Sequence, residues 1–196
     1  MASRIRFVAG LGNPGREYVA TRHNAGFWFA DALASRLGAA FVSEGRFHGQ
    51  LAKSDDVRLL KPLTYMNLSG RAVSAAMRFF GVAPDELLVV HDELDLKPGD
   101  AKLKLGGGHA GHNGLRDIVL QLGTPEFWRL RIGIGHPRDS EIPQQDVADF
   151  VLRPPGADER KAIEAAIDRG LDTWPALAAG EFERALTALH TRKEKP

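Results

Sequence analysis

The chain has 196 residues, of which 43% are hydrophobic and 26% charged, a composition typical of one globular domain. Its 26 basic and 25 acidic residues give a net charge of +1, which excludes a strongly basic nucleic-acid binder but leaves a local basic site open. The absence of cysteine excludes thiol nucleophiles, thiolate metal sites and disulfides. No apolar segment has the length of a membrane span or of a secretory signal, so we expect a cytoplasmic protein without a membrane partner.

The first half of the chain alternates strand and helix patterns. Ile5 to Leu11 is an apolar run of strand length that ends in a Gly- and Pro-rich turn, and Asn24 to Leu37 repeats apolar residues at helical spacing. Phe47 to Lys53 and Val57 to Lys61 predict two strands around a polar turn. Leu68 to Phe80, followed by a glycine, predicts the next helix.

The second half continues this alternation. The patterns predict strands at Leu87–Val90, Ala101–Leu105 and Trp128–Gly135, and helices at about Leu115–Leu122, Asp158–Ala179 and Glu181–Leu189. The polar segment from 136 to 149 contains two prolines and is expected to form a mobile cover. We therefore predict an α/β fold in which residues 1–190 form a single catalytic domain and residues 191–196 a solvated basic tail.

Polar residues cluster in the loops of this pattern, at strand ends and helix starts. His23 precedes a helix, Asp92 follows a buried strand, and Asn13, Asn67 and Asn113 occupy loops. Individually these residues suit turns, helix caps or a lysine pair, but loops of this kind converge on one cleft in many α/β proteins. If they converge, His23 can take a proton from water, Asp92 can fix its tautomer, and the carboxamides can bind an acyl group and a developing oxyanion.

Three other chemistries compete with this hypothesis. Gly10, Gly12 and Gly15 match a dinucleotide-binding pattern, but the acidic residue expected about 20 positions later falls in the predicted helix at Asp31. Serine hydrolysis lacks a nucleophile elbow, since Ser69 looks like a helix cap. A metal-dependent hydrolase stays open as an alternative, because six residues offer nitrogen or oxygen ligands: His91, Asp92, Glu93, Asp95, His109 and His112.

The chain resembles bacterial peptidyl-tRNA hydrolases at several motifs in order. These are GLGNPGREYVATRHNAG from Gly10, TYMNLSG from Thr64, HDELDL from His91, KLGGGHAGHNGL from Lys104 and RLRIGIGHP from Arg129. The resemblance implies hydrolysis of the ester that joins a peptide to the 3′ end of tRNA. It also implies one α/β domain with a mixed, twisted β-sheet flanked by α-helices, a monomer, and no bound metal or other cofactor.

The resemblance also implies roles for individual residues. His23 would be the catalytic base and Asp92 its support, while Asn13 would distinguish a peptide-bearing amino group from a free one. Further residues would bind the substrate: Asn67 and Asn113 near the ester, Tyr18 and Tyr65 at the tRNA end, and Lys104 and Arg131 at the terminal phosphate. A non-catalytic protein that binds the tRNA end is the second alternative. From Arg138 onward the likeness weakens, so acceptor-stem contacts are not assigned.

Overall fold

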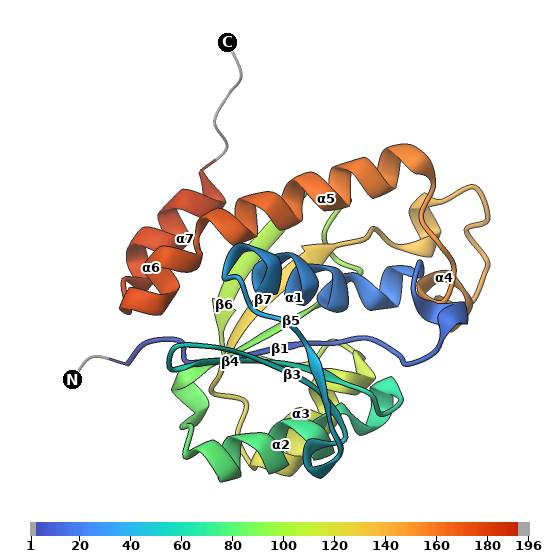
Figure 1. Ribbon diagram of the computed structural model, residues 1–196. Coiled ribbons are helices and arrows are strands. Elements are labelled where there is room, and N and C mark those ends of the chain that lie inside the picture. The colour runs from blue at the N-terminus through green and yellow to red at the C-terminus, as the bar shows by residue number, and fades with distance from the viewer. Residues whose placement is uncertain (1–2, 192–196) are drawn as a thin grey trace.

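A computed structural model describes residues 3–191, which form a β-sheet covered by helices on both faces (Figure 1). The seven strands of these residues lie in the order β2-β3-β4-β1-β5-β7-β6. The central strands β4, β1, β5 and β7 are parallel, whereas β2, β3 and β6 are antiparallel to their neighbours. The strands are β1 (Phe7–Gly10), β2 (Val42–Glu44), β3 (Gly49–Ser54), β4 (Val57–Pro62), β5 (Leu87–Glu93), β6 (Ala101–Leu105) and β7 (Trp128–Gly133).

The helices divide between the two faces of the sheet, as Figure 1 shows. One face packs against α1 (Ala25–Arg36), α5 (Ala157–Asp172), α6 (Trp174–Ala179) and α7 (Phe182–His190), and the other against α2 (Ser69–Phe80) and α3 (Asn113–Leu122). The short α4 (Val147–Val151) lies at one end of the molecule. Each face has its own apolar core, because the parallel strands alternate apolar side chains to both sides.

The predicted α/β fold with a mixed sheet flanked by helices is confirmed, but three element predictions need correction. The predicted helix from Asp158 to Ala179 is two helices, since Pro175 lacks an N–H and cannot continue α5. The expected strand from Phe47 begins two residues later, after a 3₁₀ turn, and the short exposed strand β2 was not predicted. Strand β5 extends to Glu93, so the first three residues of the polar motif after Val90 are themselves strand.

The region after β7 contains more structure than predicted. A 3₁₀ turn (Pro137–Asp139) lies in the segment for which we expected a mobile cover, and α4 begins in it. The predicted tail lies outside the described residues except for Thr191. Within residues 3–191, no helix combines the length and apolarity needed to cross a membrane.

Two glycines bring the start of α1 onto the ends of β1 and β5. A Cβ added to Gly26 would lie 2.4 Å from the Val90 oxygen and 2.4 Å from the Leu11 nitrogen, and one added to Gly10 would lie 2.3 Å from the Gly26 oxygen. Only glycine permits this approach of backbone to backbone. The 3₁₀ turn Arg22–Asn24, which precedes α1, is thereby placed at the carboxyl ends of the parallel strands.

Candidate active site

A cavity of about 320 Å³ opens at the carboxyl ends of β1 and β5. Six of the nine predicted site residues line it: Asn13, His23, Tyr65, Asn67, Asp92 and Asn113. They come from five separate segments, so the predicted convergence of strand ends and helix starts occurs. The rest of the wall includes the apolar side of α4, with Val147, Ala148, Val151 and the following Leu152.

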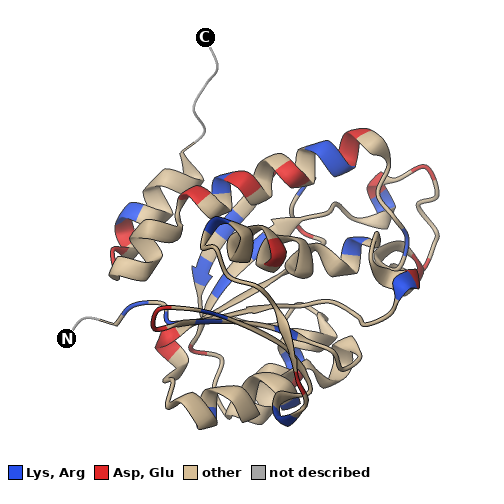
Figure 2. Cartoon of the chain, viewed as in Figure 1, with Lys and Arg blue, Asp and Glu red and all other residues tan. Residues whose placement is uncertain are grey.

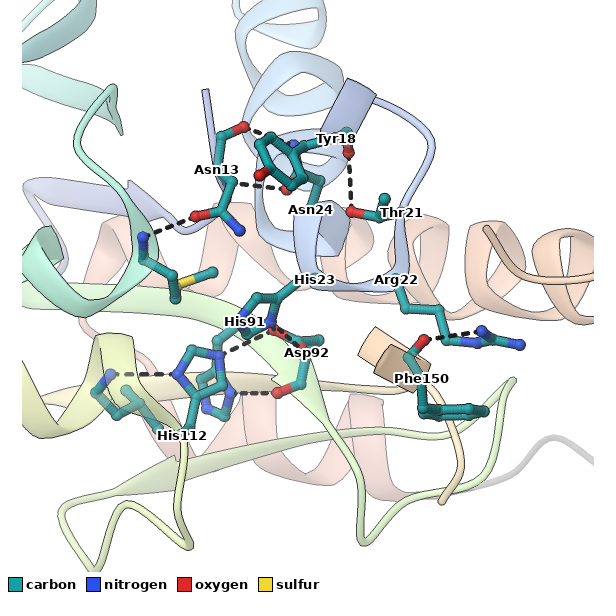
Figure 3. A network of polar contacts seen from close by, with 12 residues as sticks. Asn13, Tyr18, Thr21, Arg22, His23, Asn24, His91, Asp92, His112 and Phe150 are labelled. Carbon is teal, nitrogen blue, oxygen red and sulfur yellow. Dashed lines mark hydrogen bonds and ion pairs between the residues drawn. The ribbon is translucent and has the colours of Figure 1, made fainter. Parts of the chain in front are cut away.

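Asp92 forms the centre of the site and holds two histidines (Figure 3). Its two carboxylate oxygens lie 3.0 and 2.9 Å from His23 Nδ1, and Oδ1 lies 2.9 Å from His112 Nε2. A carboxylate only accepts hydrogen bonds, so His23 donates from Nδ1 and His112 from Nε2. The predicted support of His23 by Asp92 is therefore present in the geometry, and the alternative that Asp92 pairs with a lysine is wrong.

These hydrogen bonds fix the tautomers of the histidines. Because Nδ1 of neutral His23 carries the proton, its Nε2 has a free lone pair. His112 Nδ1 accepts the Leu115 N–H at 3.3 Å, which keeps the proton of His112 on the nitrogen that faces Asp92. His91 Nδ1 donates to the Asp92 backbone oxygen at 2.8 Å, and its Nε2 is buried without a partner in the described part of the chain.

The electrostatics of the cluster favour a basic His23. Burial lowers the pKa of His23, but the charge of Asp92 and its hydrogen bond outweigh burial and raise that pKa above the ordinary value. Burial disfavours the Asp92 carboxylate as well, yet His23 and His112 hold the pKa of Asp92 well below its usual range. Burial, followed by the neighbouring His112, lowers the pKa of His91 to about 3, so His91 stays neutral.

Asn13 is held at the cavity wall by three hydrogen bonds. Its backbone N–H donates to Asn24 Oδ1 at 2.8 Å, its carbonyl accepts from Asn24 Nδ2 at 3.0 Å, and its side-chain Oδ1 accepts the Met66 N–H at 2.7 Å. Its Nδ2 group forms no hydrogen bond with the described residues, so the end of the side chain left for a ligand is a donor.

Asn67 and Asn113 line the cavity with exposed side chains that form no hydrogen bond within residues 3–191. The cap interpretation fails for both, since α2 is preceded by Leu68 at the cap position and His112 caps α3. Their segments are tied together where Asp117 Oδ2 accepts the Gly70 N–H at 2.8 Å. Two carboxamides without hydrogen-bond partners in this part of the chain therefore line one cavity, and the segments that carry them are held together by the Asp117–Gly70 hydrogen bond.

The remaining predicted residues do not line the cavity. Tyr18 ends a 3₁₀ turn and is half-buried, with its backbone oxygen accepting from the Thr21 hydroxyl at 2.9 Å. Lys104 is exposed on β6, and Arg131 on β7 donates from Nε to Glu93 Oε1 at 2.7 Å. Blue segments in Figure 2 mark the basic residues along β6 and β7, but Arg129 is buried and donates to the Gly107 and Gly108 oxygens. The tRNA-end residues thus lie outside the cavity itself, except for Tyr65.

The six residues of the metal alternative do not form one group. Among the described residues, the cluster with metal-binding geometry is His23, Asp92 and His112, whose ligand atoms lie within 4.8 Å of one another. His109 instead accepts the Gly111 N–H through Nδ1. A metal ion at the cluster would have to replace the protons that join both histidines to Asp92.

Comparisons with known proteins agree with this geometry. The sequence model of the family described as "Peptidyl-tRNA hydrolase" matches residues 7–196. The chain belongs to the peptidyl-tRNA hydrolase family. Peptidyl-tRNA hydrolase from Bordetella avium is 57% identical over 97% of this chain and 94% of that protein, and the one from Polynucleobacter asymbioticus is 55% identical over 95% and 98%. The crystal structure of peptidyl-tRNA hydrolase from Acinetobacter baumannii has a TM-score of 0.92 and 45% identity, and covers 98% of both chains.

The family and enzyme class expected from the motifs are confirmed, and neither the metal-dependent hydrolase nor the non-catalytic binding protein is favoured. Sequence reasoning missed four residues that shape the site: Arg22, Asn24, His112 as a partner of Asp92, and Asp117. Arg22, Asn24 and His112 are sequence neighbours of predicted site residues within the quoted motifs, and this proximity could have indicated a role for them. Asp117 had none, since its partner is a backbone N–H.

Proposed function

We propose that this enzyme cleaves the ester between a peptide and the 3′ end of tRNA with a water molecule activated by His23. The observation that most directly supports this mechanism is the His23–Asp92 pair, which lies at the wall of a cavity that is also lined by carboxamides without hydrogen-bond partners among the described residues. A histidine with a free Nε2 and a raised pKa is a suitable general base near neutral pH.

The proposed steps use only residues at this cavity. His23 Nε2 removes a proton from water as the oxygen attacks the ester carbonyl, and Asp92 stabilises the resulting imidazolium. A carboxamide N–H of Asn67 or Asn113 donates to the oxyanion of the tetrahedral intermediate. The intermediate collapses with cleavage of the bond to the ribose oxygen, which takes the proton from His23. The products are tRNA with its hydroxyl restored and the peptide's carboxylic acid, which loses its proton to solvent to give the carboxylate.

Asn13 supports selection of the peptide-bearing substrate. Because its Oδ1 accepts the Met66 N–H, the group it offers to a ligand is the Nδ2 donor. A peptide carbonyl accepts from such a donor, whereas the free ammonium of an aminoacyl-tRNA has no acceptor. We therefore propose that Asn13 favours blocked amino groups.

The wider assignments follow from the same hypothesis. We propose that Lys104 and Arg131 bind the terminal phosphate of the acceptor end, and that Tyr18 and Tyr65 adjoin that end. We propose that the enzyme acts as a monomer, because one chain by itself forms the cavity and its six predicted lining residues. The absence of cysteine accords with work in the reducing cytoplasm.

Purified peptidyl-tRNA tests the mechanism directly. His23→Ala should lower kcat by about 10²- to 10⁴-fold, the usual contribution of a general base, with circular dichroism unchanged. Released peptide is measured by mass spectrometry, and aminoacyl-tRNA is the substrate control. Wild-type turnover in the variant would contradict the role of His23, and stoichiometric tRNA binding without peptide release would favour the binding protein. Loss of wild-type activity after exhaustive chelation, restored by metal, would favour the metal-dependent alternative.

A further inference from the structure

Arg22, the residue before His23, is buried and makes several contacts with the segment around α4 (Figure 3). Its Nη1 donates to the Phe150 oxygen at 3.0 Å and to the Arg153 oxygen at 3.4 Å, and its guanidinium carbon lies 4.0 Å from the centre of the Phe150 ring. The backbone N–H of Arg22 also donates to the Arg153 oxygen at 3.1 Å. The Arg22 side chain therefore stacks on Phe150 and binds one carbonyl in the last turn of α4 and one carbonyl just after the helix.

A second anchor fixes the guanidinium itself. Its Nη2 donates to Glu159 Oε2 at 2.9 Å, and the same Glu159 oxygen accepts the Gly156 N–H at 3.3 Å, at the start of α5. The Arg22 side chain is 10% exposed, so water competes weakly with these bonds. Arg22 thus joins three segments: the turn that carries His23, α4, and the N-terminal end of α5.

Helix α4 needs such an anchor because it has only five residues. An isolated helix of about one turn is unstable in water, so tertiary contacts must hold it in place. Its Phe150 and Val151 are buried in the core, and Val151 also lines the cavity together with Val147 and Leu152, which are each 40% exposed. The position of α4 therefore decides the shape of the apolar part of the cavity wall.

We propose that Arg22 is a positioning residue that sets the apolar α4 wall relative to His23, and that this wall binds the apolar side chains of the substrate's peptide. The proposal rests on the proposed function, since it needs a peptide in the cavity. Arg22 touches no reacting atom; it acts through Phe150 and the backbone of α4. Contacts of the wall with the peptide are made equally in the ground and transition states, so their loss raises KM more than it lowers kcat.

The test compares two substrates, N-acetyl-phenylalanyl-tRNA and N-acetyl-glycyl-tRNA, after wild-type cleavage of both is established. Arg22→Met should raise KM for the phenylalanyl substrate about tenfold and change kcat less than about threefold, because several charge-assisted contacts to α4 are lost. For the glycyl substrate KM should change less than about threefold, so the preference for the large side chain shrinks. Arg22→Lys should recover part of the preference, because an ammonium reaches a carbonyl but lacks the planar fork that stacks on Phe150.

Further variants keep the test decisive if Arg22→Met fails to fold. Phe150→Leu removes the stacked ring and should reproduce the loss of preference. Arg36→Met breaks an exposed ion pair between Arg36 on α1 and Asp172 on α5, and should leave both KM values unchanged. The proposal is overturned if the folded Arg22 and Phe150 variants keep the wild-type ratio of KM values, or if kcat falls equally for both substrates. If the wild type cleaves neither substrate, the proposed function fails before the role of Arg22 is measured.

Discussion

Asp92 controls the basicity of His23, because it is the charged group that opposes the effect of burial. Asp92→Asn removes the charge that raises the pKa of His23, while the burial that lowers that pKa remains. His23 then stays unprotonated to lower pH, so the acidic limb of the profile of kcat/KM against pH should move to lower pH. The maximum should fall by about 10²- to 10⁴-fold, since a neutral carboxamide no longer stabilises the imidazolium.

The profile is measured with peptidyl-tRNA over the range in which the fold is intact by circular dichroism. Asp95→Asn is a matched control, because Asp95 belongs to the same motif but is exposed and does not line the cavity. It should keep the wild-type profile. An acidic limb that stays in place or moves to higher pH in Asp92→Asn would contradict the assigned coupling.

At the level of single residues, the sequence predicted that His23, Asp92 and Asn13 converge, and the three do line one cavity, while their roles stay predictions. It did not predict that His112 shares the Asp92 carboxylate, because spacing in a Gly-rich loop does not define the direction of a ring. The same limit applies to Arg22, whose partners lie more than 100 positions away in the chain. Long-range hydrogen bonds leave no local pattern.

At the level of elements, periodicity predicted the helices and strands of the core well, and it failed where tertiary contacts decide. Helix α4 lies in a polar, proline-containing segment, and its one turn depends on Arg22 and the core rather than on its own pattern. Strand β2 has three partly or fully exposed residues and is defined by pairing with β3. Both elements are too short for a sequence period to appear.

The hydrogen bond between Asp117 on α3 and Gly70 on α2 predicts that the segments carrying Asn67 and Asn113 keep their positions only together. Asp117 is buried, and its carboxylate accepts the Gly70 N–H at the start of α2. Asp117→Ala leaves that N–H unpaired, so the free energy of unfolding should fall by about 1–3 kcal/mol. KM for peptidyl-tRNA should rise, because Asn67 and Asn113 lose their common support.

Urea unfolding and steady-state kinetics measure these two effects. Asp117→Asn is the matched variant, since its carboxamide oxygen can still accept the Gly70 N–H, and it should lose less stability and keep a KM close to wild type. If the two variants are equally active and equally stable, the Asp117–Gly70 hydrogen bond does not hold the segments together.

At the level of the whole molecule, the parallel centre of the sheet explains why the site lies where it does. Strands β1 and β5 end at the same edge, and the starts of α1, α2 and α3 meet them there. The predicted phosphate-binding residues lie elsewhere, on the paired strands β6 and β7 at one side of the sheet, where Lys104 opposes Arg129 and Lys102 opposes Arg131. The proposed catalytic and phosphate-binding residues therefore lie on adjacent but separate parts of one sheet.

This separation, together with a net charge of only +1, predicts that tRNA binding depends only weakly on salt concentration and that this dependence arises from a few residues on β6 and β7. Each phosphate neutralised contributes about 0.7–0.9 to the slope of log K against log salt, so two phosphate contacts give a slope of about −1.4 to −1.8. Lys104→Met should reduce the magnitude of the slope by about 0.7–0.9 and raise KM at physiological salt, with kcat unchanged, because Lys104 lies outside the cavity.

The control variant Lys53→Met removes an exposed lysine from β3, toward the other edge of the sheet, and should leave the slope unchanged. Equal slopes in wild type and Lys104→Met would place the bound phosphates elsewhere on the surface, whereas equal reductions in the two variants would mean that the overall charge, rather than the β6–β7 surface, attracts the tRNA.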